Sequence, residues 1–200
     1  MQPRNAFLPL AFLSLILCGT SAAADGQAKT AVCMACHGAD GNSVNPIWPN
    51  LAGQHSQYIV AQLQAYKSGA RENASMAPMA AGLKEADMEE IGAFYAAQST
   101  KIAALDEEVD ITAAQQLYRG GDSERGIPAC MACHGPNGAG NAPAAYPALR
   151  GQHAEYTIAQ LEAYRDGSRA TDPQSMMRTI AARMSDQDIK EIARYISALH

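Results

Sequence analysis

The chain has 200 residues and a formal net charge of −5 at pH 7, and 48% of its residues are hydrophobic. An acidic chain of this kind lacks the basic surface that nucleic acid requires, so nucleic acid is excluded as a partner. Four of its five cysteines occur in two closely spaced pairs. Such pairs are typical of cofactor or metal sites.

Residues 1–24 are typical of a secretory signal peptide. Arg4 precedes an apolar run that is short for a membrane span, and small residues follow up to Ala24. We therefore expect cleavage after Ala24 and export to the periplasm. A lipid anchor on Cys18 is the alternative, but bulky Leu17 stands where a lipoprotein signal has a small residue. No later run is apolar enough to span a membrane, which leaves only peripheral membrane association open.

The string Cys-Met-Ala-Cys-His occurs twice, at residues 33–37 and 130–134. In such a string the two thiols can bond to the vinyl groups of a haem, and the histidine can bind its iron. We therefore predict two covalently bound haem c groups. The residues that would hold them are Cys33, Cys36 and His37 in the first string, and Cys130, Cys133 and His134 in the second. Zinc or disulfides are the alternatives, but neither explains a histidine directly after both pairs.

The two strings belong to a longer internal repeat. Residues 51–71 align with residues 149–169 at a constant offset of 98, and 12 of these 21 positions are identical. A period of about 100 residues indicates two small domains in series and not a solenoid. We predict an N-terminal domain over residues 25–104 and a C-terminal domain over residues 105–200, joined by an acidic connector.

Both halves show the periodicity of helices, and neither shows that of strands, so the predicted fold class is all-α. Short helices are expected before the cysteine strings, at residues 25–32 and 111–119. A middle helix at residues 55–68 ends at a glycine and recurs in the second half. Apolar residues at i, i+3 and i+7 indicate a last helix in each half. They are Met88, Ile91 and Tyr95, and then Ile189, Ile192 and Ile196.

A haem iron with one histidine ligand has a second face, and methionine is the first candidate to bind there, because a thioether closes the coordination sphere. Counting back 15 residues from the middle isoleucine of each last helix selects Met76 and Met177. Counting forward 42 residues from each string histidine selects Met79 and Met176 instead. We prefer the backward count, because the forward path crosses a difference in length between the halves.

The mature chain resembles cytochrome c4, a family of periplasmic dihaem electron carriers built from two class I cytochrome c domains. The resemblance covers the Cys-x-x-Cys-His strings, the Pro-x-Leu-x-Gly segments, the Gly-Gln-His starts of the middle helices and the closing residues 195–200. It implies that each domain wraps around one covalently bound haem c. The axial pairs that it implies are His37 with Met76 and His134 with Met177. It also implies that the carbonyls of Pro49 and Pro147 hold the histidines, and that the two haems lie near one another.

We therefore expect an electron-transfer protein and not an enzyme, with six-coordinate irons that leave no position for a small-molecule substrate. The resemblance implies that single electrons arrive from a quinol-oxidising complex and leave to a terminal oxidase or another periplasmic reductase. The alternative is a dihaem electron-relay subunit of an enzyme, such as a flavin-dependent sulfide dehydrogenase. A catalytic dihaem protein of the peroxidase type would require one iron without its methionine.

Overall fold

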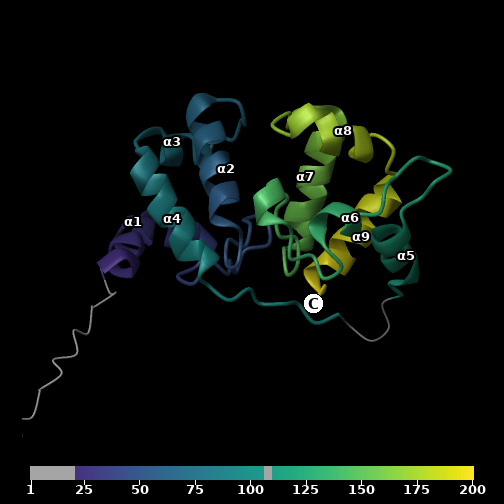
Figure 1. Ribbon diagram of the computed structural model, residues 1–200, viewed down its shortest axis with the longest axis horizontal. Coiled ribbons are helices and arrows are strands. Elements are labelled where there is room, and N and C mark those ends of the chain that lie inside the picture. The colour runs from purple at the N-terminus through teal and green to yellow at the C-terminus, as the bar shows by residue number, and fades with distance from the viewer. Residues whose placement is uncertain (1–20, 106–109) are drawn as a thin grey trace, which may run out of the picture.

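The computed structural model describes residues 21–105 and 110–200, which form two helical lobes (Figure 1). Within these residues the only extended pairings are two isolated β-bridges, so the predicted all-α fold is confirmed. Most of the predicted signal peptide, with Cys18, and most of the acidic connector lie outside the described residues. No helix in the described part of the chain is long and apolar enough to cross a membrane.

The first lobe packs its helices around one apolar core. Its described helices are α1 (Ser21–His37), α2 (Ser56–Ser68), α3 (Met76–Ala81) and α4 (Glu85–Ala96). α4 contacts both α1 and α2, and α3 contacts α2. The predicted stripe on α4 lies at the centre of this core, since Met88, Ile91 and Tyr95 are at most 2% exposed. Its burial is what holds the lobe together.

The second lobe repeats this plan with extra short turns. Its described helices are α5 (Thr112–Gly120), α6 (Met131–His134), η1 (Ala142–Ala144), α7 (Ala154–Asp166), η2 (Pro173–Ser175), α8 (Met176–Ala181) and α9 (Asp186–Ser197). α9 contacts α5 and α7, and α7 contacts α8. The predicted stripe of α9 is again buried, and it packs with Tyr118 of α5.

The helix before the cysteine string differs between the two lobes. α1 continues through the whole first string to His37, beyond the predicted end at residue 32, and stops where Gly38 takes a φ of +80°. In the second lobe α5 stops before Gly121, whose φ is +69°, and the string forms its own short helix α6. The first prediction was too short because nothing between residue 27 and the string interrupts a helix.

The two lobes pack through reciprocal hydrogen bonds. The Gln54 side chain donates to the Ala148 carbonyl at 2.9 Å and accepts from the Ala148 N–H at 3.0 Å. The Gln152 side chain makes the same two contacts with Asn50, at 2.9 and 2.8 Å. Both pairs are related by the repeat offset of 98. The interface therefore has approximate two-fold symmetry. This symmetry fixes the orientation of one cysteine string relative to the other.

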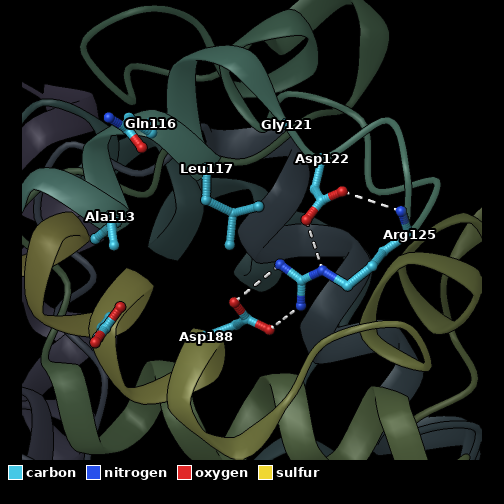
Figure 2. Close-up of a pocket in the computed structure, with 9 residues that line it drawn as sticks. Ala113, Gln116, Leu117, Gly121, Asp122, Arg125 and Asp188 are labelled. Carbon is cyan, nitrogen blue, oxygen red and sulfur yellow. Dashed lines mark hydrogen bonds and ion pairs between the residues drawn. The ribbon is translucent and has the colours of Figure 1, made fainter.

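A shallow pocket of about 210 Å³ lies between α5 and α9 (Figure 2). Arg125 crosses its rim, with Nε 2.6 Å from Asp122 Oδ2 and Nη1 2.5 Å from Asp188 Oδ2. This bridge ties the turn after α5 to the first turn of α9. Arg125 engages two of the three carboxylates that line the pocket, Asp122 and Asp188, so we assign this bridge a role in stability.

Asp188 should make the stability of the second lobe depend on acidic pH. Contacts with Arg125 and Ser185 lower the pKa of Asp188 from 3.8 to about 2. A carboxylate whose folded pKa lies below its unfolded pKa stabilises the fold above pH 4 and loses that effect as the pH falls through about 2. We expect Asp188→Asn to lower the free energy of unfolding by about 1 kcal/mol at pH 7 and by much less at pH 2.

Denaturant unfolding at the two pH values measures this difference. Asp186→Asn is the matched control, because Asp186 also lies in the first turn of α9 but its side chain is 73% exposed. A deficit in Asp188→Asn that is the same at pH 7 and pH 2 would exclude the proposed ionisation.

Candidate haem-binding sites

The histidine of each cysteine string is buried and held by a proline carbonyl. His37 Nδ1 lies 2.9 Å from the Pro49 oxygen, and His134 Nδ1 lies 2.9 Å from the Pro147 oxygen. Both contacts, which the family resemblance implied, are therefore confirmed. Because a carbonyl oxygen only accepts, each imidazole carries a proton on Nδ1. Burial lowers the pKa of both histidines, so the neutral rings keep an Nε2 lone pair with which to bind a metal.

The four cysteines of the two strings form no disulfide with one another and are half-buried. Cys33 and Cys130 pack against the cores of their own lobes. Burial raises the pKa of Cys33, and it raises the pKa of Cys130 to about 11. These two sulfurs therefore remain uncharged at neutral pH. A thioether bond to haem also leaves sulfur uncharged, so the apolar surroundings fit that attachment.

A glycine turn positions the proline carbonyl in each lobe. The Gly41 carbonyl accepts from the N–H groups of Leu51 and Ala52 at 2.7 and 3.0 Å, directly after the Pro49 segment. The Gly138 carbonyl accepts the equivalent pair in the second lobe, at 2.7 and 3.1 Å. Both glycines have positive φ values, of +76° and +66°, which side chains disfavour. The two turns therefore build the same support beneath both histidines.

The four candidate methionines lie in two short helices, α3 and α8, that the sequence did not predict. Six residues are too few to reveal a helical period. Ala80 and Ala181 are both fully buried, and each carbonyl accepts from the N–H three residues later at 3.1 Å. These alanines are 101 residues apart. The same offset relates Met76 to Met177.

The exposure of the side chains distinguishes the two candidate methionines in the first lobe only. Met76 is half-buried and packs against the first core, whereas Met79 is 47% exposed. Met176 and Met177 are both half-buried. Geometry thus favours Met76 in the first lobe, and only the alignment favours Met177 in the second.

The polar residues at the junction of the lobes were not predicted, although the repeat contained a signal. Glutamines, tyrosines and an arginine are identical in the two copies on the face where the lobes meet. A polar residue that recurs at a helix position without a partner in its own domain indicates a contact with the other copy. The members of this set in the first copy are Gln54, Tyr58, Gln62, Tyr66 and Arg71, and in the second Gln152, Tyr156, Gln160, Tyr164 and Arg169.

Comparison with known proteins places the chain among c-type cytochromes. The family described as Cytochrome c matches residues 23–99 and 111–200. Cytochrome c4 of Thiocapsa roseopersicina is 48% identical over 176 residues, which cover 87% of this chain and 91% of the relative. The thiosulfate dehydrogenase electron acceptor of Thiomonas intermedia is 38% identical over 201 residues, which cover 98% of this chain and 92% of that protein.

The solved structures agree with these relatives. The crystal structure of reduced recombinant cytochrome c4 from Pseudomonas stutzeri has a TM-score of 0.84 and 41% identity, over 89% of this chain and 98% of that one. The two matched regions fall one on each lobe, and each contains one cysteine string. The chain therefore belongs to the cytochrome c4 family, and it is an electron-transfer protein, not an enzyme, with two covalently bound haem c groups.

Proposed function

We propose that this dihaem electron carrier works in periplasmic respiratory electron transfer, with each iron bound by one histidine and one methionine. The observation that carries the proposal is the pair of hydrogen bonds from the histidine Nδ1 atoms to proline carbonyls. The proposed iron ligands are His37 and Met76 in domain 25–104, and His134 and Met177 in domain 105–200. The proposed points of covalent attachment are Cys33, Cys36, Cys130 and Cys133.

The haem supplies the one-electron chemistry, and the chain controls its surroundings. The carbonyls of Pro49 and Pro147 fix the orientation of the imidazole rings and increase the basicity of Nε2. Met76 and Met177 would each supply a thioether ligand to an iron, which would leave neither site a position for substrate. Residues 1–24 would direct export to the periplasm. N-terminal sequencing of the mature protein should then begin at Asp25.

The proposed partners are redox proteins: a quinol-oxidising complex as donor, and a terminal oxidase or another periplasmic reductase as acceptor. A second candidate donor is a thiosulfate-oxidising dehydrogenase, since the relative from Thiomonas intermedia is named for accepting electrons from such an enzyme. Stopped-flow reduction of the oxidised protein by each purified donor separates the two. The physiological donor should reduce both haems at the faster rate.

Spectroscopy and redox titration of the unmodified protein test the ligand proposal. Two haems per chain, two one-electron waves and the near-infrared band of methionine-bound ferric haem are expected. Neither haem should bind cyanide tightly. Tight cyanide binding by one haem, with half of the band missing, would indicate an open iron and a protein of the peroxidase type.

A further inference from the structure

Two arginines are buried together between the lobes. Arg71 is 6% exposed, and it donates to the side-chain oxygens of Gln62 and Gln160, both at 2.6 Å. Arg169 is 5% exposed, and it donates to the same two oxygens, both at 3.0 Å. Each glutamine oxygen therefore accepts from both guanidinium groups. The two cations belong to one network, which we call the arginine centre and define as Arg71, Arg169, Gln62 and Gln160.

Neutral tyrosines surround the arginine centre. The Arg71 guanidinium lies 4.7 Å above the ring of Tyr66, and it donates to the Tyr156 hydroxyl across the interface at 3.0 Å. Arg169 makes the equivalent contacts: its guanidinium lies 4.5 Å above the ring of Tyr164, and it donates to the Tyr58 hydroxyl across the interface at 2.9 Å. Burial raises the pKa of both stacked tyrosines, Tyr66 and Tyr164, to about 12. These phenols are therefore uncharged at physiological pH.

No carboxylate of the described chain neutralises these two positive charges. Across residues 28–105 and 110–200, neither Arg71 nor Arg169 forms an ion pair. The buried Asp172, on the same loop as Arg169, pairs with Arg178 at 2.8 Å instead. A guanidinium group does not lose its proton in a protein. Among the described residues, two fixed positive charges thus share a buried site with neutral partners.

The arginine centre is connected by packing to the proposed ligand segment of the first lobe, and by a short stretch of chain to that of the second. Tyr66, beneath Arg71, belongs to the apolar core against which Cys33 and Met76 pack. In the second lobe Arg169 lies on the loop between α7 and α8, eight residues before Met177. Low polarity and exclusion of ions let a buried charge act over longer distances than an exposed one.

We propose that Arg71 and Arg169 form a shared cationic centre that favours the ferrous state of both haems and so raises both reduction potentials. Ferric iron carries one more positive charge than ferrous iron, so a nearby buried cation destabilises the ferric form more. Because the two arginines share their hydrogen-bond acceptors across the interface, each should act on both haems. The proposal rests on the proposed function only in that both irons cycle between these two states.

Spectroelectrochemical titration of the haem-loaded full chain tests the proposal. We expect Arg71→Met and Arg169→Met each to lower both reduction potentials, and the double variant to lower them further. Arg71→Lys keeps the charge but loses the paired contacts, so its potentials should stay near those of the unmodified protein while its urea midpoint falls. Arg150→Met is the matched control, since Arg150 lies near the interface but is exposed, and it should shift neither potential.

Two results would overturn the shared centre. One is that Arg71→Met and Arg169→Met, fully loaded with haem, keep the reduction potentials of the unmodified protein. The other is an Arg71→Lys variant whose potentials fall as far as those of Arg71→Met, because that would show a packing effect and not a charge effect. Should Arg71→Met fail to load haem, Arg71→Gln takes its place. If the near-infrared band is absent from the unmodified protein, only the ligand proposal is contradicted, since both reduction potentials remain measurable.

Discussion

Met76→Ala and Met177→Ala should each remove about half of the near-infrared charge-transfer band of the oxidised protein. Each variant would lose the thioether from one iron and keep it on the other. The reduction potential of the altered haem should fall, because methionine opposite histidine raises that potential. The open iron should also bind cyanide. Absorption and magnetic circular dichroism in the near infrared measure the band, and redox titration measures the potential.

The neighbouring methionines provide matched controls. Met79→Ala should leave the band intact, because Met79, three residues after Met76 in the same short helix, is 47% exposed. Met176→Ala is the more demanding control, since Met176 and Met177 are adjacent and both half-buried. If Met176→Ala removes half of the band and Met177→Ala does not, the forward count from the histidine is correct in the second lobe.

The sequence predicted what depends on local pattern. The repeated cysteine strings and the stripe of Ile189, Ile192 and Ile196 follow from spacing along a single segment. The contact between His37 and Pro49 was implied by family resemblance, and it forms over only 12 residues of chain. Such features need no knowledge of how distant segments meet.

Features that depend on the meeting of the two lobes were not predicted. Arg71 and Gln160 are 89 residues apart. Their recurrence in both copies signals a contact between the copies, but no local pattern specifies which residue meets which. An arginine on a loop after a helix is ordinarily solvated, so local composition predicts an exposed side chain. The interface changes that outcome because its two-fold symmetry brings both copies of the arginine to the same pair of glutamines.

Gly41→Ala should lower the free energy of unfolding of the first domain by about 3 kcal/mol. The φ of Gly41 is +76°, and an added Cβ would lie 2.7 Å from a ring carbon of Tyr95 and 2.8 Å from the Ala52 nitrogen. Tyr95 is fully buried in the core, and the Ala52 N–H is hydrogen-bonded to Gly41 itself. Neither neighbour can move away without disrupting the core or the turn. Denaturant unfolding, followed by circular dichroism, measures the loss.

Gly69→Ala separates backbone strain from this contact. The φ of Gly69 is +77°, almost the same as that of Gly41, but nothing lies within 4 Å of an added Cβ. Strain alone should cost about 1 kcal/mol. Gly138→Ala should fall between the two, because its closest neighbour is the end of the Leu199 side chain, at 2.8 Å. Equal losses in Gly41→Ala and Gly69→Ala would mean that the turn can yield, and that its glycine is needed only for its dihedral angle.

The Gly41 turn also connects stability to the first haem site. Its carbonyl fixes the Leu51 and Ala52 N–H groups, and these directly follow the Pro49 segment that holds His37. A displaced turn should therefore loosen the imidazole of the first domain and leave that of the second unchanged. Gly41→Ala is expected to broaden the absorption bands of the first haem and to lower the temperature at which that haem site melts. The second haem should be unaffected. Equal changes at both haems would instead indicate that the damage passes through the interface.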